Sequence, residues 1–274
     1  MRSIEGRFSS LLVWLACALS ADPALAARCQ DPAGFETWLE NVQQEAAGQG
    51  ISNRAISAAL AGVSYDPAVV SRDRRQGVFR QTFEQFSARM VSAYRLQRGG
   101  ALIKRHAATF GRIEEQFGVP APVIVAIWGL ETDFGVNQGK FGTIRALASL
   151  AYDCRRTEKF QAELMDALRI VERGDLSPGE MHGAWAGEIG QTQFMPSSYL
   201  KFALDYDGDG RRDLIRSVPD ALASTANYLQ SYGWRRGEAW STGSANFEVL
   251  LEWNKSQVYS KTIAYFASKL AGEE

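Results

Sequence analysis

Histidine is scarce in this sequence of 274 residues, and its scarcity excludes several kinds of catalytic site. The two histidines, His106 and His182, lie far apart and do not have the spacing of metal ligands. Zincin-type chemistry and nucleophilic catalysis by Ser-His-Asp or Cys-His groups therefore lack the residues that they require.

An excess of charge of either sign is also missing, since the formal net charge is -1. We expect no nucleic-acid partner, because no basic surplus is available to neutralise a phosphate backbone. The sequence carries no internal repeat, low-complexity tract or long charged linker. Its length and its 46% of hydrophobic residues predict one medium-sized domain with a proper core.

The apolar run nearest the N-terminus, "LLVWLACALS", is too short to predict a membrane span. Arg2 and Arg7 precede this run, and small residues at 24–26 offer a cleavage site. We therefore predict a secretory signal peptide over residues 1–26 and a mature periplasmic chain of residues 27–274.

Only three cysteines are present, and Cys17 lies within the predicted signal peptide. Lipid attachment there is the alternative to soluble export, but Trp14 stands where a lipidation motif has an aliphatic residue. Export leaves Cys29 and Cys154, which would most simply form a disulfide in an oxidising compartment. Two buried free thiols are the alternative.

The chain from residue 35 onward is predicted to be helical almost throughout, because apolar residues recur at three- and four-residue spacing. Only "FEVLLEW", residues 247–253, favours a strand. The expected fold class is thus mainly α, with at most a small β element near the C-terminus. The predicted helices cover residues 35–47, 53–63, 79–94, 100–119, the segment leading to Glu131, 143–153, 157–173, 196–204, 219–232 and 256–270.

Residues 27–274 are treated as one unit, because the best candidate boundary, the polar stretch 241–246, is short. Within this unit we expect a helical part over about 27–118 and a core over about 119–240. A C-terminal strand and helix follow over about 246–272.

Glu131 directly follows a run of apolar or small residues, 124–130. On a helix it shares a face with Ile124, Ile127 and Trp128, so it should be partly withdrawn from water. It also lies near the end of the helix, where the macrodipole is negative. Both effects raise the pKa of a carboxyl group, as an acid catalyst near neutral pH requires. A solvent-facing glutamate at a fraying helix end is the alternative.

A second informative stretch, "GAWAGEIGQTQFMPSSY", covers residues 183–199. Gly183, Gly187 and Gly190 leave the backbone bare, which predicts close approach of a polymer. By composition alone, the stretch is more typical of an ordinary glycine loop that leads into a helix.

Polar and aromatic side chains in the same stretch suit a glycan that carries N-acetyl groups. Gln193 supplies both an acceptor and donors, which match an acetamido group. Trp185, Phe194 and Tyr199 offer flat apolar faces on which sugar rings can stack.

Three motifs together resemble the lytic murein transglycosylases of the membrane-bound B type. They are "VIVAIWGLETDFG", "GEIGQTQFMPSSY" and "DYDGDGRRDL", in the order and at roughly the spacing of that family. The similarity runs from about residue 35 to 240 and resumes over residues 252–270. The resemblance implies a lysozyme-like α-helical core.

The resemblance also implies cleavage of the β-1,4 bond between N-acetylmuramic acid and N-acetylglucosamine in peptidoglycan strands. The one catalytic glutamate of the family matches Glu131, which acts first as an acid and then as a base towards the 6-hydroxyl of the sugar. A 1,6-anhydro ring forms without water, so neither a cofactor nor a second catalytic carboxylate is required, unlike in two-carboxylate glycosidases. Asp133 is expected to be structural, or else a hydrolase candidate.

Other positions match substrate-binding residues of the family. Trp253 replaces a tyrosine of the family pattern, which preserves a stacking face but alters the polar tip. Ala184 replaces a serine found in some relatives and Gln191 replaces a tyrosine, so the resemblance does not carry over the polar contacts of these two positions. The arginine pair is associated with the stem peptide, although a solvated helix start is its alternative. The matched positions are Gln193, Phe194, Trp253, Asn254, Tyr259, Arg155 and Arg156, beside Tyr199 proposed above.

The acidic stretch 205–213 has the residue pattern of a calcium-binding loop. Position twelve is Arg216, where a bidentate glutamate is expected, and Asp220 would serve if the loop is longer. An Asx-turn loop ordered without metal is the alternative. The predicted ligands of a structural calcium ion are Asp205, Asp207, Asp209, Arg211 through its carbonyl, Asp213 and Asp220.

Longer members of the family insert a satellite domain where this chain has only residues 235–246. We therefore expect a short variant that acts as a monomer on peptidoglycan, and partners in the cell-wall machinery are left open. Two other functions remain as alternatives: a lysozyme-type hydrolase on the same fold and a noncatalytic wall-binding protein.

Overall fold

The computed structural model of the chain describes residues 31–75 and 81–273. Within these residues the fold is mainly α, as predicted, with thirteen helices and one two-stranded antiparallel sheet. The helices are α1 (Pro32–Gly48), α2 (Asn53–Leu60), α3 (Pro67–Arg74), α4 (Phe83–Met90), α5 (Ala93–Arg105), α6 (Ala107–Phe117), α7 (Ala121–Thr132), α8 (Thr143–Tyr152), α9 (Thr157–Arg173), α10 (Pro196–Phe202), α11 (Val218–Ser231), α12 (Ala245–Trp253) and α13 (Gln257–Ala271). The strands are β1 (Phe141–Gly142) and β2 (His182–Gly183).

The predicted signal peptide, Cys17 and Cys29 lie outside the described residues. The signal peptide, the lipid-attachment alternative and the disulfide between Cys29 and Cys154 therefore stay predictions. In the part of the chain that the structure describes, no helix is both long enough and apolar enough to cross a membrane.

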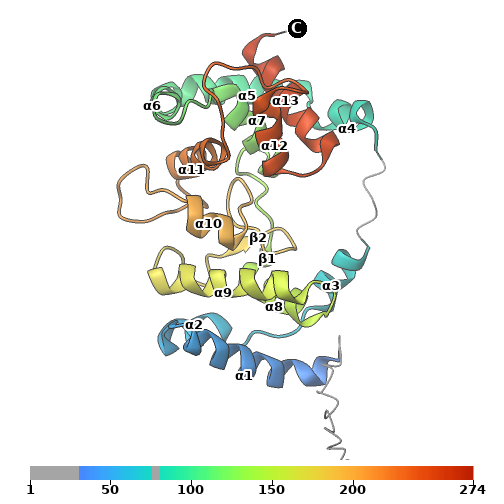
Figure 1. The fold of residues 1–274 in the computed structure, drawn as a ribbon, viewed down its shortest axis with the longest axis vertical. Coiled ribbons are helices and arrows are strands. Elements are labelled where there is room, and N and C mark those ends of the chain that lie inside the picture. The colour runs from blue at the N-terminus through green and yellow to red at the C-terminus, as the bar shows by residue number, and fades with distance from the viewer. Residues whose placement is uncertain (1–30, 76–80, 274) are drawn as a thin grey trace, which may run out of the picture.

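Two groups of helices lie at opposite ends of the molecule (Figure 1). In one group, α1, α2 and α3 pack with α8 and α9. In the other, α7 packs with α5, α6, α11 and α13, and α4 and α12 lie against α13. Between the two groups, α10 contacts both α9 and α11, and the small sheet lies beside it (Figure 1).

The predicted N-terminal helical part, residues 27–118, is not one structural layer. Its first three described helices pack on α8 and α9, whereas α5 and α6 pack on α7. Hydrophobic periodicity marks which face of a helix is buried, but it does not say against which partner.

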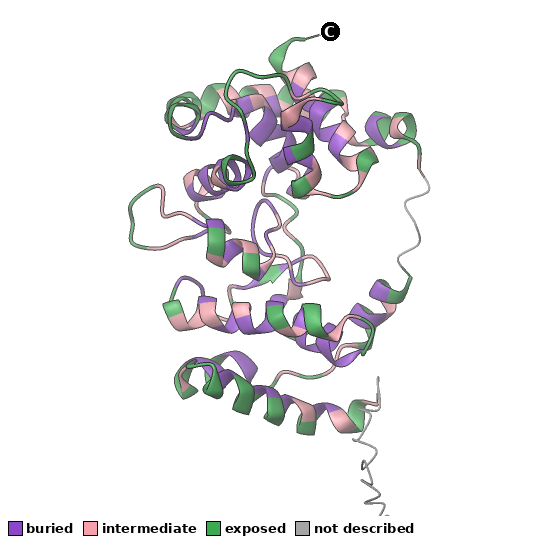
Figure 2. Cartoon of the chain, in the orientation of Figure 1, coloured by how far each residue is buried: buried purple, intermediate pink, exposed green. Residues whose placement is uncertain are grey.

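Helix α7 is buried along its length and has no exposed residue. Every residue of α7 except Pro122 and Glu131 is buried, which Figure 2 shows as a purple helix within the upper group. A helix that is apolar all round belongs in the interior of a protein. The prediction of one buried face was therefore too narrow, because only Pro122 near the start and Glu131 near the end depart from full burial.

The strand predicted at residues 247–253 is wrong, because this segment forms α12. Ser244 begins the helix by accepting a hydrogen bond from the backbone N–H of Phe247 at 3.1 Å. Phe247 and Leu250 are three residues apart and both are buried, which is a helical spacing. The small β element instead lies in the middle of the chain, where Phe141 pairs with Gly183.

Two other predicted helices are each interrupted. The helix predicted at 79–94 is broken after Met90: Ser92 accepts a hydrogen bond from the N–H of Arg95 at 3.3 Å and begins α5. The Nη1 atom of Arg95 also donates a hydrogen bond to the carbonyl of Met90 at 2.9 Å. The helix predicted at 100–119 is broken at His106, whose backbone leaves the helical region and whose ring lies edge-on against Trp128.

The short connection in place of a satellite domain is present as predicted. Residues 232–244, between α11 and α12, form turns and contain no strand. Asn246, at the start of α12, closes this connection through hydrogen bonds with the backbone of Arg235 and Glu238 at 2.7–3.0 Å.

The packing of α7 on α13 predicts a specific sensitivity at Gly129. A Cβ atom there would lie 2.8 Å from the ring of Phe134 and 3.0 Å from the ring of Phe266. We expect Gly129→Ala to lower the free energy of unfolding by about 1–3 kcal/mol, because the two rings would have to shift in a close-packed core. Chemical denaturation monitored by circular dichroism measures this change.

Gly100→Ala is the matched control, because Gly100 also lies inside a helix but a Cβ atom there meets nothing within 4 Å. This substitution should stabilise the protein by up to about 1 kcal/mol through helix propensity. Equal effects of the two substitutions would contradict the packing argument.

Candidate active site

Glu131 lies at the end of α7 and receives hydrogen bonds from two other helices. Its Oε1 atom accepts a hydrogen bond from Nε1 of Trp253, on α12, at 3.0 Å. The same atom accepts a hydrogen bond from the hydroxyl of Tyr259, on α13, at 2.8 Å. Three segments distant in sequence thus meet at one carboxyl group.

Burial raises the pKa of the Glu131 carboxyl from 4.5 to about 7. The hydrogen bonds from Trp253 and Tyr259 lower the pKa, and the negative charge of Glu188 raises it further. The prediction that Glu131 is sheltered from water with a raised pKa is therefore confirmed. The group can hold a proton near neutral pH and can also release it.

Directly after α7, the backbone turns sharply through two non-glycine residues with left-handed conformation. Asp133 has φ 53° and Phe134 has φ 61°. The carboxylate of Asp133 pairs with Nε of Arg95 at 3.2 Å, and Phe134 packs edge-on against Trp128. Strain of this kind persists only where the surroundings hold it in place. Asp133 thus helps to hold the chain as it leaves α7.

The segment 184–195 is docked onto the end of α7 through Gln191. The hydroxyl of Thr132 donates to the carbonyl of Gln191 at 2.5 Å. The side-chain carbonyl of Gln191 accepts from Nε1 of Trp128 at 3.0 Å. Gln191, which replaces a tyrosine of the family pattern, is therefore buried between the segment and α7. It does not line the groove that opens beside Glu131.

Gln193 lines the groove, but its amide is already used by the protein. Its Nε2 atom donates to the carbonyls of Gln138 at 3.1 Å and Gly190 at 2.8 Å. Its Oε1 atom accepts from the backbone N–H of Ala184 at 3.1 Å. Both amide protons are occupied, so a contact with an acetamido group would have to use the remaining acceptor capacity of Oε1.

The glycines of this segment are needed for packing within the protein. A Cβ atom on Gly183 would lie 1.6 Å from the carbonyl oxygen of Glu188, and one on Gly190 would lie 2.5 Å from that of Leu214. Gly187 is similarly close to the side chain of Leu147. The prediction that these glycines leave the surface bare for a polymer is therefore wrong, because protein atoms occupy the space that they leave.

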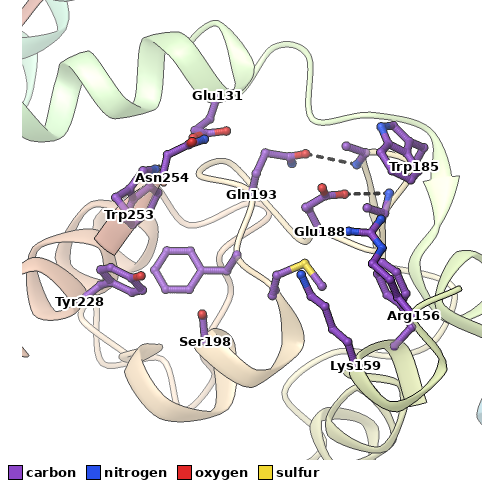
Figure 3. Close-up of a pocket in the computed structure, with 15 residues that line it drawn as sticks. Glu131, Arg156, Lys159, Trp185, Glu188, Gln193, Ser198, Tyr228, Trp253 and Asn254 are labelled. Atoms are coloured by element: carbon purple, nitrogen blue, oxygen red, sulfur yellow. Dashed lines mark hydrogen bonds between the residues drawn. The ribbon is translucent and has the colours of Figure 1, made fainter. Parts of the chain in front are cut away.

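A groove of about 470 Å³ opens beside Glu131, within the usual size range of ligand sites. Glu131, Trp253 and Asn254 lie on one side of it in Figure 3. Glu188, Arg156 and Lys159 lie on the other side. Its lining residues are Glu131, Arg156, Lys159, Phe160, Ala184, Trp185, Ala186, Glu188, Gln193, Phe194, Met195, Ser198, Tyr228, Trp253 and Asn254.

The predicted aromatic faces differ in what they offer to this groove. Trp185 is half-buried and lines it. Phe194 also lines it, but the ring is 3% exposed and packs edge-on against Trp253 and Tyr228. Tyr199 is wholly buried, and its hydroxyl donates to the carbonyl of Arg212. The prediction that Tyr199 stacks on a sugar ring is therefore wrong.

The two predicted arginines share one buried carboxylate. Nε of Arg155 lies 2.9 Å from Oδ2 of Asp73, and the guanidinium of Arg156 pairs with Oδ1 of the same residue. Only Arg156 of the two lines the groove, and its guanidinium also stacks 4.7 Å above the ring of Phe160. The pair thus anchors α3 to the start of α9 and presents one cation to the groove.

The groove residues that the sequence analysis did not single out include Lys159, Glu188, Ser198 and Tyr228. Lys159, Ser198 and Tyr228 come from helices whose place beside Glu131 no local pattern indicates. Glu188 did carry a signal, because it is an acidic residue among the small and apolar residues of "WAGEIG". Burial raises the pKa of Glu188, and Lys159 lowers it.

The acidic loop brings together only part of the predicted calcium ligands. Carboxylate oxygens of Asp205, Asp207 and Asp209 lie within 4.8 Å of one another. Asp220 instead accepts hydrogen bonds from the backbone N–H groups of Tyr206, Asp207 and Asp213 at 2.7–3.2 Å, which holds the loop from within.

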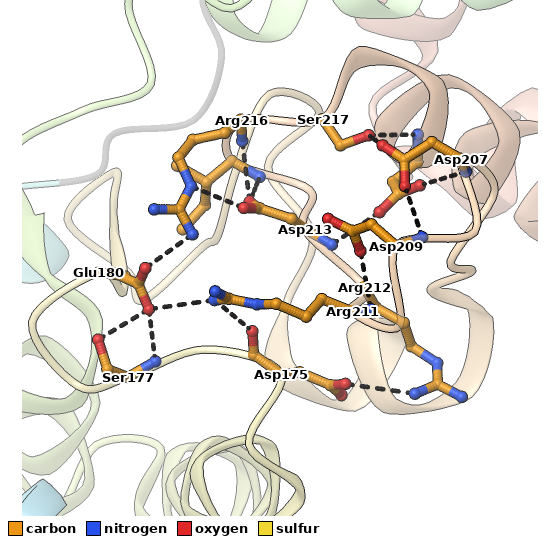
Figure 4. A network of polar contacts seen from close by, with 12 residues as sticks. Asp175, Ser177, Glu180, Asp207, Asp209, Arg211, Arg212, Asp213, Arg216 and Ser217 are labelled. Atoms are coloured by element: carbon orange, nitrogen blue, oxygen red, sulfur yellow. Dashed lines mark hydrogen bonds and ion pairs between the residues drawn. The ribbon is translucent and has the colours of Figure 1, made fainter.

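Asp213 and Arg216 belong to an ion-pair network beside that loop (Figure 4). Nε of Arg216 lies 2.7 Å from Oδ2 of Asp213, and its Nη2 atom lies 2.7 Å from Glu180. Arg211 and Arg212 extend the network to the segment after α9, where Arg212 pairs with Asp175 at 3.2 Å. Position twelve, which was expected to complete the calcium site, is therefore an arginine, and its side chain is already paired with Asp213 and Glu180.

A mainly α-helical frame that holds one sheltered acid in a groove defines a lysozyme-like class of protein. A family model described as "Transglycosylase SLT domain" matches residues 34–245. This chain therefore belongs to the family of proteins with a transglycosylase SLT domain. The resemblance to lytic transglycosylases of the membrane-bound B type is confirmed.

Individual relatives agree with this assignment. The chain is 35% identical over 155 residues to membrane-bound lytic murein transglycosylase B of Escherichia coli (strain K12). That alignment covers 56% of this chain and 43% of the relative, so the match spans less than half the length of that protein.

Two solved structures are similar over most of the chain. SltB3 from Pseudomonas aeruginosa, solved in complex with NAG-NAM-pentapeptide and with NAG-anhNAM-pentapeptide, has a TM-score of 0.83 and 32% identity. The match covers 87% of this chain and 80% of that one. Escherichia coli Slt35 in complex with calcium has a TM-score of 0.76 over 85% of this chain and 92% of that one. At 22% identity, this second match shows the fold alone.

The contact between Tyr259 and Glu131 predicts a measurable shift of the acid. The Tyr259 hydroxyl lowers the pKa of Glu131, so Tyr259→Phe should raise that pKa above its parent value of about 7. Carbon-13 NMR of glutamate carboxyl groups, with Glu131→Gln to assign the signal, follows the titration directly.

Tyr265→Phe is the control for this titration, because Tyr265 lies on the same helix but is 40% exposed. It should leave the pKa of Glu131 at the parent value. An unchanged titration in Tyr259→Phe would show that the hydrogen bond does not act on the acid.

Proposed function

We propose that this protein is a peptidoglycan lytic transglycosylase. The bond cleaved is the β-1,4 bond between N-acetylmuramic acid and N-acetylglucosamine, and the product carries 1,6-anhydro-N-acetylmuramic acid. The single observation that carries the proposal is Glu131, a carboxyl group with a pKa of about 7 at the wall of a groove. Membership of the transglycosylase family supports the same chemistry.

The reaction uses Glu131 twice. In the free protein near neutral pH, the group holds a proton that it gives to the glycosidic oxygen as the bond to the anomeric carbon breaks. The resulting carboxylate then accepts the proton of the 6-hydroxyl on the same sugar, whose oxygen closes the ring at that carbon. Glu131 ends protonated as it began, and no water is consumed.

Trp253 and Tyr259 support the charged stage of this cycle. Both donate to Oε1 of Glu131, so they stabilise the carboxylate that exists between the two proton transfers. The donors stay in place when the charge appears, because they are fixed on α12 and α13, and α13 packs on α7.

A role in substrate binding is proposed for the residues that share the groove with Glu131. Asn254 and Arg156 line it from opposite sides, and Trp253 and Trp185 contribute aromatic surface. The complexes of SltB3 with NAG-NAM-pentapeptide support a glycan with its stem peptide as the substrate class. Gln193 and Phe194 line the same groove and shape it.

A lysozyme-type hydrolase is the second candidate, and one observation favours it. Glu188 places a second carboxylate in the groove, and paired carboxylates are the usual equipment of hydrolytic glycosidases. A hydrolase would release reducing sugar ends in place of anhydro sugars.

We also infer that the protein is exported and acts as a monomer in the periplasm, where peptidoglycan lies. The predicted signal peptide and the relationship to a membrane-bound murein transglycosylase support this location. The proposed chemistry requires no cofactor.

Glu131→Gln tests the proposal. Glutamine keeps the shape of the side chain but cannot transfer a proton, so release of anhydro-muropeptides should fall roughly 10²–10⁴-fold. Mass spectrometry of the products from purified cell wall measures the loss and separates anhydro products from reducing ends. Anhydro-muropeptide release at the parent rate would remove Glu131 from its role.

Two controls accompany this test. Asp133→Asn removes a nearby carboxylate but suits the left-handed backbone, so it should keep most of the activity.

Glu131→Gln should melt at or above the parent temperature at pH 8. The folded-state pKa of Glu131 lies above the unfolded one, so its contribution to stability is present at low pH and is lost as the pH rises through about 7.

We infer that the acidic loop binds calcium weakly, as a structural ion. The three gathered carboxylates of Asp205, Asp207 and Asp209 are the oxygen ligands that calcium prefers. The fit is partial, because Asp213 and Asp220 are engaged elsewhere and position twelve is Arg216. Water would have to complete the coordination, so the affinity should be low.

Thermal unfolding with and without calcium tests this inference. Millimolar calcium chloride should raise the melting temperature, since an ion that binds only the folded state stabilises it. Asp209→Asn should abolish the rise, and magnesium chloride should not reproduce it, because magnesium demands a stricter geometry. An equal melting temperature with calcium and with a chelator would contradict the inference.

A further inference from the structure

A second carboxylate, that of Glu188, lines the groove beside Glu131, and the proposed reaction does not use it. Glu188 lies in the segment between β2 and α10, and its side chain lines the same groove (Figure 3). Its backbone is fixed, because Gly183 packs so closely on the Glu188 carbonyl that no Cβ atom fits between them. The position of the carboxylate is thus set by the fold.

The carboxylate of Glu188 has few partners of its own. Its Oε2 atom accepts a hydrogen bond from the backbone N–H of Ala186 at 3.0 Å. Across residues 31–75 and 81–273, Glu188 makes no ion pair. Two cations line the groove: Arg156, directly before α9, is paired with Asp73, and Lys159, on α9, is exposed. The negative charge of Glu188 therefore remains largely directed into the groove.

The charges around the two carboxylates are unequal. Lys159 favours the ionised form of Glu188, whereas no cation is among the groups that shift Glu131. Trp253 and Tyr259 donate hydrogen bonds to Glu131. Burial raises the pKa of Tyr259, and the positive charge of Arg95, on α5, lowers it. When two carboxyl groups share one sheltered space, ionisation of one opposes ionisation of the other. Lys159 is thus the charged group that distinguishes the two carboxyl groups.

We propose that Glu188 is a positioning residue for the proton of Glu131: its negative charge across the groove keeps Glu131 in the acid form until a glycan binds. A bound glycan displaces water from the groove, which strengthens the repulsion between the two groups. This role rests on the proposed transglycosylase function, but its first test does not depend on activity.

Direct titration of Glu131 in Glu188→Gln tests the proposal. Glutamine keeps the acceptor for the N–H of Ala186 and removes only the charge. Carbon-13 NMR of the carboxyl groups should show the pKa of Glu131 lower than in the parent, by on the order of one pH unit. Glu188→Asp, which retains a charge, should give a smaller decrease.

The pH profile of activity on purified cell wall supplies the second readout. The first step requires protonated Glu131, so kcat/KM falls as the pH rises through its pKa. In Glu188→Gln this fall should occur at lower pH. Lys159→Gln should move the fall in the same direction, because Glu188 then ionises less readily.

Glu158→Gln is the matched control, because Glu158 is an exposed glutamate on α9 that does not line the groove. It removes the same charge and should shift neither the NMR titration nor the pH profile. An unchanged pKa of Glu131 in a folded Glu188→Gln protein would overturn the proposal even if the parent is an active transglycosylase.

Two other outcomes would also overturn it. Loss of activity at every pH in a folded Glu188→Gln protein would mean that Glu188 touches the substrate directly. A parent that releases reducing ends, and loses them in Glu188→Gln, would instead make Glu188 the base of a hydrolase. Absence of any wall-cleaving activity in the parent, with the NMR shift intact, would fault the proposed function and leave the coupling of the two groups standing.

Discussion

The burial of one carboxyl group at the end of an otherwise apolar helix is the constraint on which the rest of the site depends. Helix α7 is covered by other helices on all sides and has no exposed residue. Glu131 lies one residue before its end. A charged carboxylate in that place is unfavourable, and the group therefore keeps its proton to a higher pH than an exposed glutamate. Hydrogen bonds from Trp253 and Tyr259 limit this effect, so the proton remains transferable.

The segment that follows β2 gives this acid a groove to act in. Gln191 and Thr132 attach the segment to α7, and the close approach at Gly183 fixes its fold. Beside it, the ion pairs of Arg216 with Glu180 and Asp213 hold the acidic loop against the segment after α9 (Figure 4). The groove is thus shaped by contacts behind its surface.

The two carboxylates of the groove differ because their neighbours differ. Glu131 is surrounded by apolar side chains and two neutral donors, whereas Glu188 lies near the cation of Lys159. Groups of the same chemical type can therefore serve as acid and as anion within one site. A single-glutamate reaction and a second carboxylate are compatible when the second acts through the first.

The family resemblance, and not the apolar run before Glu131 alone, singled out the acid. Local sequence predicted most of the helices, because periodicity and capping residues are properties of neighbouring positions. Local sequence did not determine α12. The segment "FEVLLEW" by itself favours a strand, but it forms a helix that Ser244 caps. Only the tertiary structure decided that Tyr199 is buried, that Gln191 faces α7 and that Glu188 faces the acid. The physical reason is that burial and charge coupling depend on segments far apart in the chain, whose meeting no local pattern specifies.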